Sequence, residues 1–159
     1  MSHKIYTRAP ETMTNLDQIE AALKLMGYTA VARPVPGQPH YTRRDDELLV
    51  PAACLPKDLP RVYGTYEYLG YRRTASGAVE RIVDSMHVDK GTGQLNSAPA
   101  LFESLIHIGY QAAGLTTALD TLGLTYAIQT AASGEIDILV ETGAAAFGAA
   151  SFGAVSTAL

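Results

Sequence analysis

Two stretches of the chain place apolar side chains at every third or fourth position, which is the period of a helix with one buried face. The first stretch covers residues 14–27, and its apolar positions are Leu16, Ile19, Ala22, Leu23 and Met26. Thr14 or Asn15 can cap the N-terminus through a side-chain oxygen, and Gly27 suits the C-terminus. The pattern therefore predicts a short amphipathic helix that ends before Gly27.

The second stretch runs from residue 97 to residue 122 and has a wider apolar stripe. Its apolar positions are Leu101, Leu105, Ile108, Ala112, Leu115, Leu119 and Leu122, with a parallel row at Phe102, Ile106, Gly109 and Ala113. Asn96 or Ser97 can cap the start, and Gly123 ends the repeat. We expect one long helix packed on a sheet. A coiled coil is the alternative, which the lack of consistent flanking charges disfavours.

Alternating apolar and polar side chains predict strands around these helices. The strands are expected at residues 3–8, 28–33, 61–73, 79–86, 125–131 and 135–141. Turn sequences at residues 75–77 and 133–134 join two of the pairs as hairpins. Residues 34–60 are rich in proline, which breaks strand ladders, so we expect an irregular loop there with at most one short strand.

This order of elements implies an α+β fold in which a mostly antiparallel sheet carries both helices on one face. Residues 1–142 are expected to form a single domain. The length of 159 residues and the 47% of apolar side chains suit one globular domain.

Residues 143–159, GAAAFGAASFGAVSTAL, depart from both periods and carry no charge. Phe147 and Phe152 would lie about 140° apart on a helix and on opposite faces of a strand, so neither element gathers both rings into one stripe. We expect an extended C-terminal arm held by another protein molecule, with packing on the chain's own sheet as the alternative. The residues expected to anchor this arm are Phe147, Phe152, Val155 and Leu159.

The net charge, the cysteine count and the N-terminal sequence exclude some classes of protein. The net charge of −4 argues against a general nucleic-acid binder. The single cysteine, Cys54, excludes an internal disulfide. The first residues, MSHKIYTRAPETM, do not resemble a secretory signal, and no apolar run is long enough to span a bilayer. We expect a cytoplasmic or virion-associated protein that is not secreted by a classical signal and has no membrane partner.

The opening MSH, the helix LDQIEAALKLMGY and the later stretch LGLTYAIQTAASGEIDILVE resemble a family of uncharacterised proteins. The family occurs in cyanobacteria, plastid genomes and other bacteria, and is known as hypothetical chloroplast reading frame thirty-five. It has no established activity, so the resemblance implies the α+β fold and transfers no catalytic residue. Some relatives are thought to be encoded beside ring-forming ATPases, which would imply an accessory protein for such an ATPase.

Residues that could perform chemistry are few. Asp84, His87 and Asp89 are ligand types for cations, but polar residues at the end of a hairpin are the favoured interpretation. Cys54 has no neighbouring cation in the sequence, which favours an inert thiol. Residues 90–93, KGTG, lack the spacing of a phosphate-binding loop and predict a turn. We therefore predict no catalytic, cofactor-binding or metal-binding residues.

The tyrosine-rich stretch 61–73 has two interpretations. Its start, RVYGTYEY, partly matches an RNA-recognition strand, whose exposed face would present Tyr63 and Tyr71 for base stacking. Glu67 between them and the acidic net charge oppose contact with phosphates. We favour packing of Tyr63 and Tyr71 in a sheet or protein interface, with RNA binding as the alternative.

The sequence as a whole favours a non-enzymatic structural or assembly subunit. Such a subunit would associate with itself or dock on a larger particle, as in a virion, through its C-terminal arm. Binding to a ring-forming ATPase and binding to RNA are the alternatives.

Overall fold

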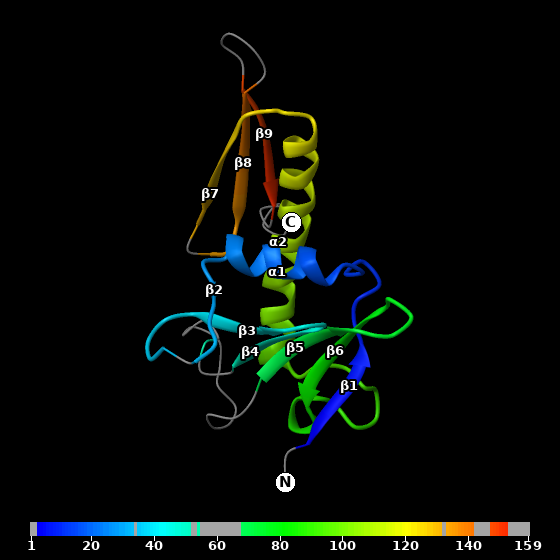
Figure 1. Ribbon diagram of the computed structural model, residues 1–159. Coiled ribbons are helices and arrows are strands. Elements are labelled where there is room, and N and C mark those ends of the chain that lie inside the picture. Colours follow the sequence, from blue (N-terminus) through cyan, green and yellow to red (C-terminus); the bar gives the residue numbers. More distant parts are fainter. Residues whose placement is uncertain are drawn as a thin grey trace.

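The strands that precede the long helix form one sheet, and the strands that follow it form another (Figure 1). The computed structural model describes residues 3–33, 35–51, 54, 68–131, 133–141 and 147–152. The helices are α1 (Leu16–Leu25) and α2 (Ser97–Thr121), with a short 3₁₀ helix, η2 (Ser85–His87). The strands are β1 (Lys4–Arg8), β2 (Thr29–Ala30), β3 (His40–Arg44), β4 (Glu47–Pro51), β5 (Tyr68–Arg73), β6 (Val79–Asp84), β7 (Tyr126–Thr130), β8 (Ile136–Glu141) and β9 (Phe147–Phe152).

The first sheet has the strand order β1-β6-β5-β4-β3-β2 and is antiparallel except for the short β2–β3 pair. Both helices lie on one of its faces. Tyr41 of β3 donates a hydrogen bond to Glu20 of α1, and Tyr71 of β5 donates one to Glu103 of α2. The predicted α+β fold, with mostly antiparallel strands and both helices on one face, is confirmed. The separate second sheet, β7-β8-β9, was not predicted.

The start and end of α1 follow directly from its sequence. Asn15 is the capping residue, because its side-chain oxygen accepts hydrogen bonds from the backbone N–H groups of Asp17 at 3.0 Å and Gln18 at 3.2 Å. Gly27 has φ of 91°, which glycine adopts without strain. The predicted apolar face is confirmed, since Leu16, Ile19, Ala22 and Leu23 are buried.

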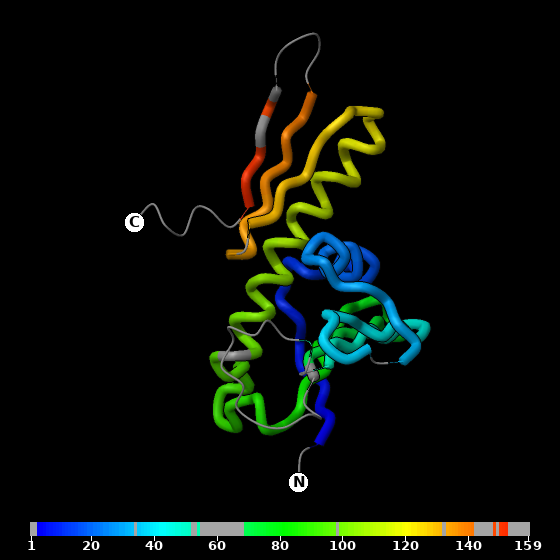
Figure 2. The backbone as a smooth tube through the Cα atoms, turned by 90° about the vertical axis from the view of Figure 1, so that its left-hand side faces the viewer, coloured from blue at the N-terminus to red at the C-terminus, as the bar shows by residue number. Residues whose placement is uncertain are grey.

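Helix α2 is shared by two apolar cores. Its 25 residues span about 37 Å, long enough to pass the first sheet and continue beneath the second (Figure 2). Phe102 and Ile106 are buried in the core of the first sheet with α1, whereas Ala112 and Leu119 are buried against β8 of the second. The helix thus packs on sheets, as predicted, and links them.

The two helices approach each other closely at Gly109. A Cβ atom at this position would lie 3.1 Å from Ala22 Cβ and 3.1 Å from the Ala22 carbonyl oxygen. Such separations are tighter than most Cβ contacts in proteins, so a side chain at position 109 requires α1 to shift by a few tenths of an ångström or more.

The expectation of an irregular loop over residues 34–60 is wrong for its middle part. Strands β3 and β4 form an antiparallel hairpin there, with Asp45 at φ of 46° in the turn. The prolines mislead because they flank the strands: Pro39 precedes β3, and Pro51 is the last residue of β4. The alternation of buried and less buried side chains that is typical of a strand is present in β4, since Leu48 and Val50 are buried.

The first part of the expected C-terminal arm belongs to the second sheet. Strand β9 pairs antiparallel with β8, with Phe147 opposite Glu141 and Phe152 opposite Ile136. Another molecule is therefore not needed to hold residues 147–152, and packing on the chain's own sheet is what the structure shows for them. The small residues between the two phenylalanines fit a strand at the edge of the sheet. Residues 153–159 lie outside the described residues.

Replacing Gly109 with valine should push α1 away from α2. We expect Gly109→Val to lower the free energy of unfolding by about 2 kcal/mol or more, through overpacking at the helix contact. Ala118→Val places the same side chain at an exposed position of α2 and should lower it by about 0.5 kcal/mol, through helix propensity. Urea denaturation followed by circular dichroism measures both. Equal losses would contradict the close contact.

Candidate functional site

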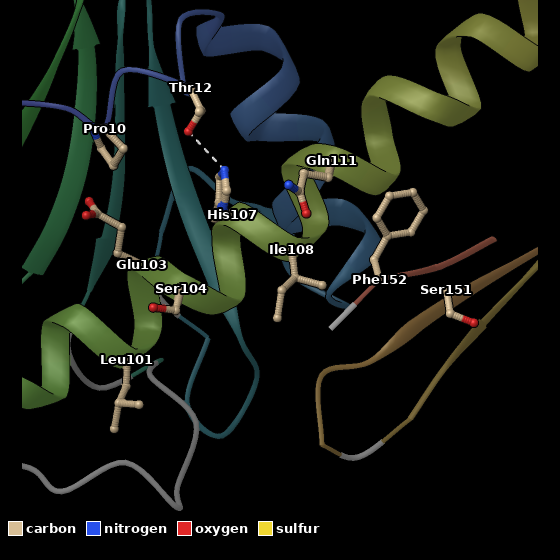
Figure 3. Close-up of a pocket in the computed structure, with 10 residues that line it drawn as sticks. All are labelled: Pro10, Thr12, Leu101, Glu103, Ser104, His107, Ile108, Gln111, Ser151 and Phe152. Atoms are coloured by element: carbon tan, nitrogen blue, oxygen red, sulfur yellow. Dashed lines mark hydrogen bonds between the residues drawn. The ribbon is translucent and has the colours of Figure 1, made fainter. Parts of the chain in front are cut away.

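An open groove of about 710 Å³ runs along α2, beside the link between β1 and α1 (Figure 3). The link contributes Pro10 and Thr12, and β9 contributes Ser151 and Phe152 at one end. The remaining lining residues come from α2 and are Leu101, Glu103, Ser104, His107, Ile108 and Gln111. The groove therefore joins three parts of the chain that are far apart in sequence.

The carboxylate of Glu103 is held by a buried ion pair with Arg81 of β6. The guanidinium donates from Nε to Oε2 at 2.7 Å and from Nη2 to Oε1 at 2.5 Å, and the two side chains are only 11% and 12% exposed. Arg81 Nη1 also donates to the Thr7 hydroxyl at 3.1 Å. The charge of Glu103 is thus neutralised within the protein, so the groove does not present it as a free anion.

Tyr71 completes this cluster from β5. Its hydroxyl donates to Glu103 Oε2 at 2.8 Å, and the side chain is fully buried. Burial, together with the adjacent Glu103 carboxylate, raises the pKa of Tyr71 well above its usual value. Tyr71 therefore remains a neutral hydrogen-bond donor at physiological pH.

Hydrogen bonds fix the wall of the groove that the β1–α1 link provides. His107 Nε2 and the Thr12 hydroxyl share a hydrogen bond of 2.9 Å (Figure 3). The Tyr110 hydroxyl accepts from the backbone N–H groups of Thr14 and Asn15, both at 3.2 Å. The start of α1 is thus attached to the middle of α2, and the wall has a defined position.

The groove suits binding better than bond-making chemistry. Glu103 is paired with Arg81, His107 is bonded to Thr12, and the Ser104 hydroxyl donates to the Ala100 carbonyl at 3.0 Å. Among the described residues that line it, Thr12 and His107 pair a hydroxyl with an imidazole, but no lining carboxylate is hydrogen-bonded to that imidazole to orient it as a base. Its open surface is apolar, and Leu101 is 50% exposed.

A second candidate surface is the exposed edge of the three-stranded sheet. Strand β7 is at this edge, and nearly all of its residues are exposed. Leu122 is 71% exposed and Ile128 is 38% exposed. No charged residue occurs between Asp120 and Glu135. This surface is therefore an uncharged strand edge next to exposed apolar side chains.

The hydrogen-bond pattern shows which groups of β7 point outward. The N–H of Glu141 donates to the carbonyl of Thr125 at 2.9 Å. The N–H of Ala131 donates to the carbonyl of Glu135 at 2.9 Å. Bonded and non-bonded positions alternate in an antiparallel pair. Every second residue, starting at Tyr126, therefore directs its backbone N–H and C=O groups away from β8. The residues with outward N–H and C=O groups are Tyr126, Ile128 and Thr130. No described strand covers this edge.

Cys54 has a basic neighbour that sequence reasoning missed. Its Sγ lies 3.1 Å from His40 Nδ1, and both residues are buried. A thiol beside an imidazole is a reactive combination where substrate can reach it. The pair does not line the groove, and the Tyr28 hydroxyl donates to the Cys54 carbonyl at 2.8 Å, which ties this segment to the core. His40 and Cys54 are 14 positions apart, and no local sequence pattern relates them.

The structure describes only some of the predicted interface residues of the tyrosine-rich stretch and the C-terminal arm. Tyr71 is fully buried on the face of the first sheet that packs under the helices, which agrees with the favoured interpretation of packing in a sheet and not with the exposed face that RNA binding requires. Phe152 is partly buried against the core of the second sheet. The backbone of Phe147 is in β9, while its side chain is outside the described part of the chain. Tyr63, Val155 and Leu159 also lie outside it.

The carboxylates near η2 stabilise turns. Asp84 accepts from the N–H of Met86 at 2.9 Å and caps η2. Asp89 accepts from the N–H groups of Gly91 and Thr92 and from the Thr92 hydroxyl, which lowers the pKa of its carboxyl group. The predicted turn at residues 90–93 is confirmed. The described residues contain no group of three side chains placed to hold a metal ion.

Breaking the buried ion pair should destabilise the protein strongly. We expect Arg81→Met to lower the free energy of unfolding by about 3 kcal/mol or more, because it leaves the Glu103 charge buried and unpaired. The double variant Arg81→Met with Glu103→Leu should regain much of this loss. Arg8→Met removes an exposed partner of Glu11 and should change stability by less than about 0.5 kcal/mol. Denaturant unfolding of the four proteins provides the test, and a double variant as unstable as Arg81→Met would contradict it.

Tyr71 should make stability sensitive to alkaline pH. A phenol whose pKa is raised by folding contributes its full stability below its ordinary value of 10.0 and loses it as the pH rises further. For one such proton, stability should fall by about 1.4 kcal/mol per pH unit above pH 10. In Tyr71→Phe, this slope should decrease by one proton, whereas the profile from pH 7 to 9 should keep its shape. Urea unfolding across pH 7–11.5 measures the slopes; identical alkaline slopes would refute the assignment.

No described helix combines the length and the apolar character that crossing a bilayer requires. The resemblance of parts of the chain to the chloroplast reading frame family remains a prediction. Comparisons with protein-family models, with curated proteins and with solved structures gave no match.

Proposed function

We propose that this protein is a structural or assembly subunit that binds a second copy of itself through the edge of β7. The observation that carries the proposal is the row of outward backbone groups at Tyr126, Ile128 and Thr130 on an uncharged edge. Natural sheets usually protect such an edge with charge, proline or a bulge, because an open edge pairs readily with another strand. Residues 126–130, YAIQT, contain no charge and no proline.

Two-fold symmetry gives this contact a specific register. If two copies of β7 pair antiparallel around Ile128, each Ile128 lies opposite its own equivalent, and each Tyr126 lies opposite Thr130 of the second copy. All three outward positions then form hydrogen bonds, and the two small sheets become one six-stranded sheet. An interface that uses the same patch twice is the commonest kind in soluble oligomers.

The packing of α2 leaves room for this arrangement. The helix lies over β8 and β9, where Ile136 and Ile138 are fully buried. The side chain of Ile128 points to the same side as that of Ile138, its partner in the β7–β8 register, but remains 38% exposed. A second copy would cover this surface. Strand β9 leaves the opposite edge of the sheet without a described partner strand, so a further contact there would extend a dimer into a larger particle such as a virion.

The two other functions have less support. RNA binding was expected to use Tyr63 and Tyr71, but Tyr71 is buried and cannot stack on a base. Binding to a ring-forming ATPase depends on the family resemblance alone. Self-association is therefore the function that the geometry supports best.

A charge at the centre of the proposed contact should prevent association. Ile128→Lys places two ammonium groups opposite each other, and we expect self-association to weaken by about tenfold or more. Thr117→Lys adds the same charge at an exposed position of α2 and should leave association unchanged. Sedimentation equilibrium across a range of protein concentrations measures the dissociation constants.

Mixing opposite charges provides the sharper test. Ile128→Lys and Ile128→Glu should each be monomeric alone and should associate when mixed, because the two-fold pairing then joins opposite charges. Circular dichroism checks that both variants are folded. A wild-type protein that remains monomeric at high concentration, or a dimer that Ile128→Lys leaves intact, would refute the proposal.

A further inference from the structure

The groove on α2 begins where β9 ends. Ser151 and Phe152, the last residues of β9, line one end of it, where Phe152 lies next to Gln111 (Figure 3). Strand β9 runs in the direction opposite to α2, so Phe152 is at the end of β9 that is nearer the N-terminal half of the helix (Figures 1 and 2). The groove extends in that same direction, from Gln111 to Leu101.

The next seven residues are long enough to follow the groove to its far end. In extended form, residues 153–159 span up to about 23 Å. The stretch of α2 from Leu101 to Gln111 rises by about 15 Å. If an extended segment follows the groove from Phe152, it would pass Ser104 near Val155 and reach Leu101 near Thr157.

The chemistry of the segment matches that of the groove. Residues 153–159, GAVSTAL, are uncharged, with apolar side chains at Val155 and Leu159 and small ones between them. The groove is apolar at Leu101 and Ile108, and the charge of Glu103 is already neutralised by Arg81. An uncharged occupant thus leaves no buried charge unpaired, whereas a charged one would lose hydration without gaining a partner.

We propose that the groove on α2 binds residues 153–159 of the same chain. This contact covers the exposed side chain of Leu101 and extends the attachment of the second sheet onto the first core. It does not rest on the pairing of β7 proposed above, because the groove and the β7 edge share no residue. Another protein that uses this groove would have to displace the segment first.

Disulfide trapping in the full chain tests the proposal. Leu101→Cys combined with Thr157→Cys places two thiols at positions that the docked segment brings together. Thr117→Cys combined with Thr157→Cys is the matched control, because Thr117 is exposed on α2 beyond the other end of the groove. The native Cys54 is buried and remains in both proteins. The experiment is done in dilute protein carrying Ile128→Lys, so that the β7 contact does not contribute.

Under mild oxidation, the 101–157 pair should form an intrachain disulfide about tenfold faster than the 117–157 pair, as its higher effective concentration requires. Mass spectrometry of the unreduced protein identifies the bond. Equal rates for the two pairs would overturn the proposal. Disulfides that join two chains would also overturn it, and would indicate instead that the groove receives the segment of a second copy.

A single-cysteine measurement covers the case in which a double variant misfolds. The thiol of Leu101→Cys should be alkylated several-fold more slowly than that of Thr117→Cys, and adding Val155→Asp should remove the difference. The protection should not depend on protein concentration. Protection that is absent, that persists with Val155→Asp, or that increases with concentration would contradict docking of the chain's own segment.

Discussion

The buried ion pair between Arg81 and Glu103 determines where the long helix can lie. A guanidinium that donates two parallel hydrogen bonds to one carboxylate fixes the orientation as well as the distance of its partner. Tyr71 adds a hydrogen bond to the carboxylate and Thr7 accepts one from the guanidinium, so each charge has a polar partner besides the other. Three strands of the first sheet are thereby attached to one position on α2. The groove, the link to α1 and the start of the second sheet all take their places from that helix.

The second sheet is less well supported than the first. Its core consists of Ala112 and Leu119 from α2 and of Ile136 and Ile138 from β8. Three strands packed on one helix face have little apolar surface to bury, and their stability depends on that helix. Additional burial is therefore valuable here, either along β7 from a second copy or along α2 from the residues that follow β9. Both proposals add burial to the second sheet or to the segment that follows its last described strand.

Local patterns in the sequence predicted most of the helices and strands. They did not predict contacts between residues that are far apart in the chain. Asn15, Gly27 and Gly123 mark helix ends through their own backbone and side-chain chemistry, so the sequence alone predicts where the helices begin and end. Alternation placed Tyr63 and Tyr71 on one face of the predicted strand but gave no information about whether that face is covered. The groove depends on Arg81 and Glu103, 22 positions apart, and the Cys54 contact depends on His40, 14 positions away. No periodicity relates such residues, because only the folded chain brings them together.

The pairing of β1 with β6 has a consequence for synthesis of the chain. The Thr7 hydroxyl and the Arg81 guanidinium that meet in the folded protein are 74 positions apart. At about 5–20 residues per second, a ribosome needs roughly 4 to 15 seconds to make the stretch between them. During that time β1 is a nascent strand without its native partner. Lys4 and Arg8 are on the exposed face of β1, and positive charge of this kind disfavours pairing with another strand before β6 has been made.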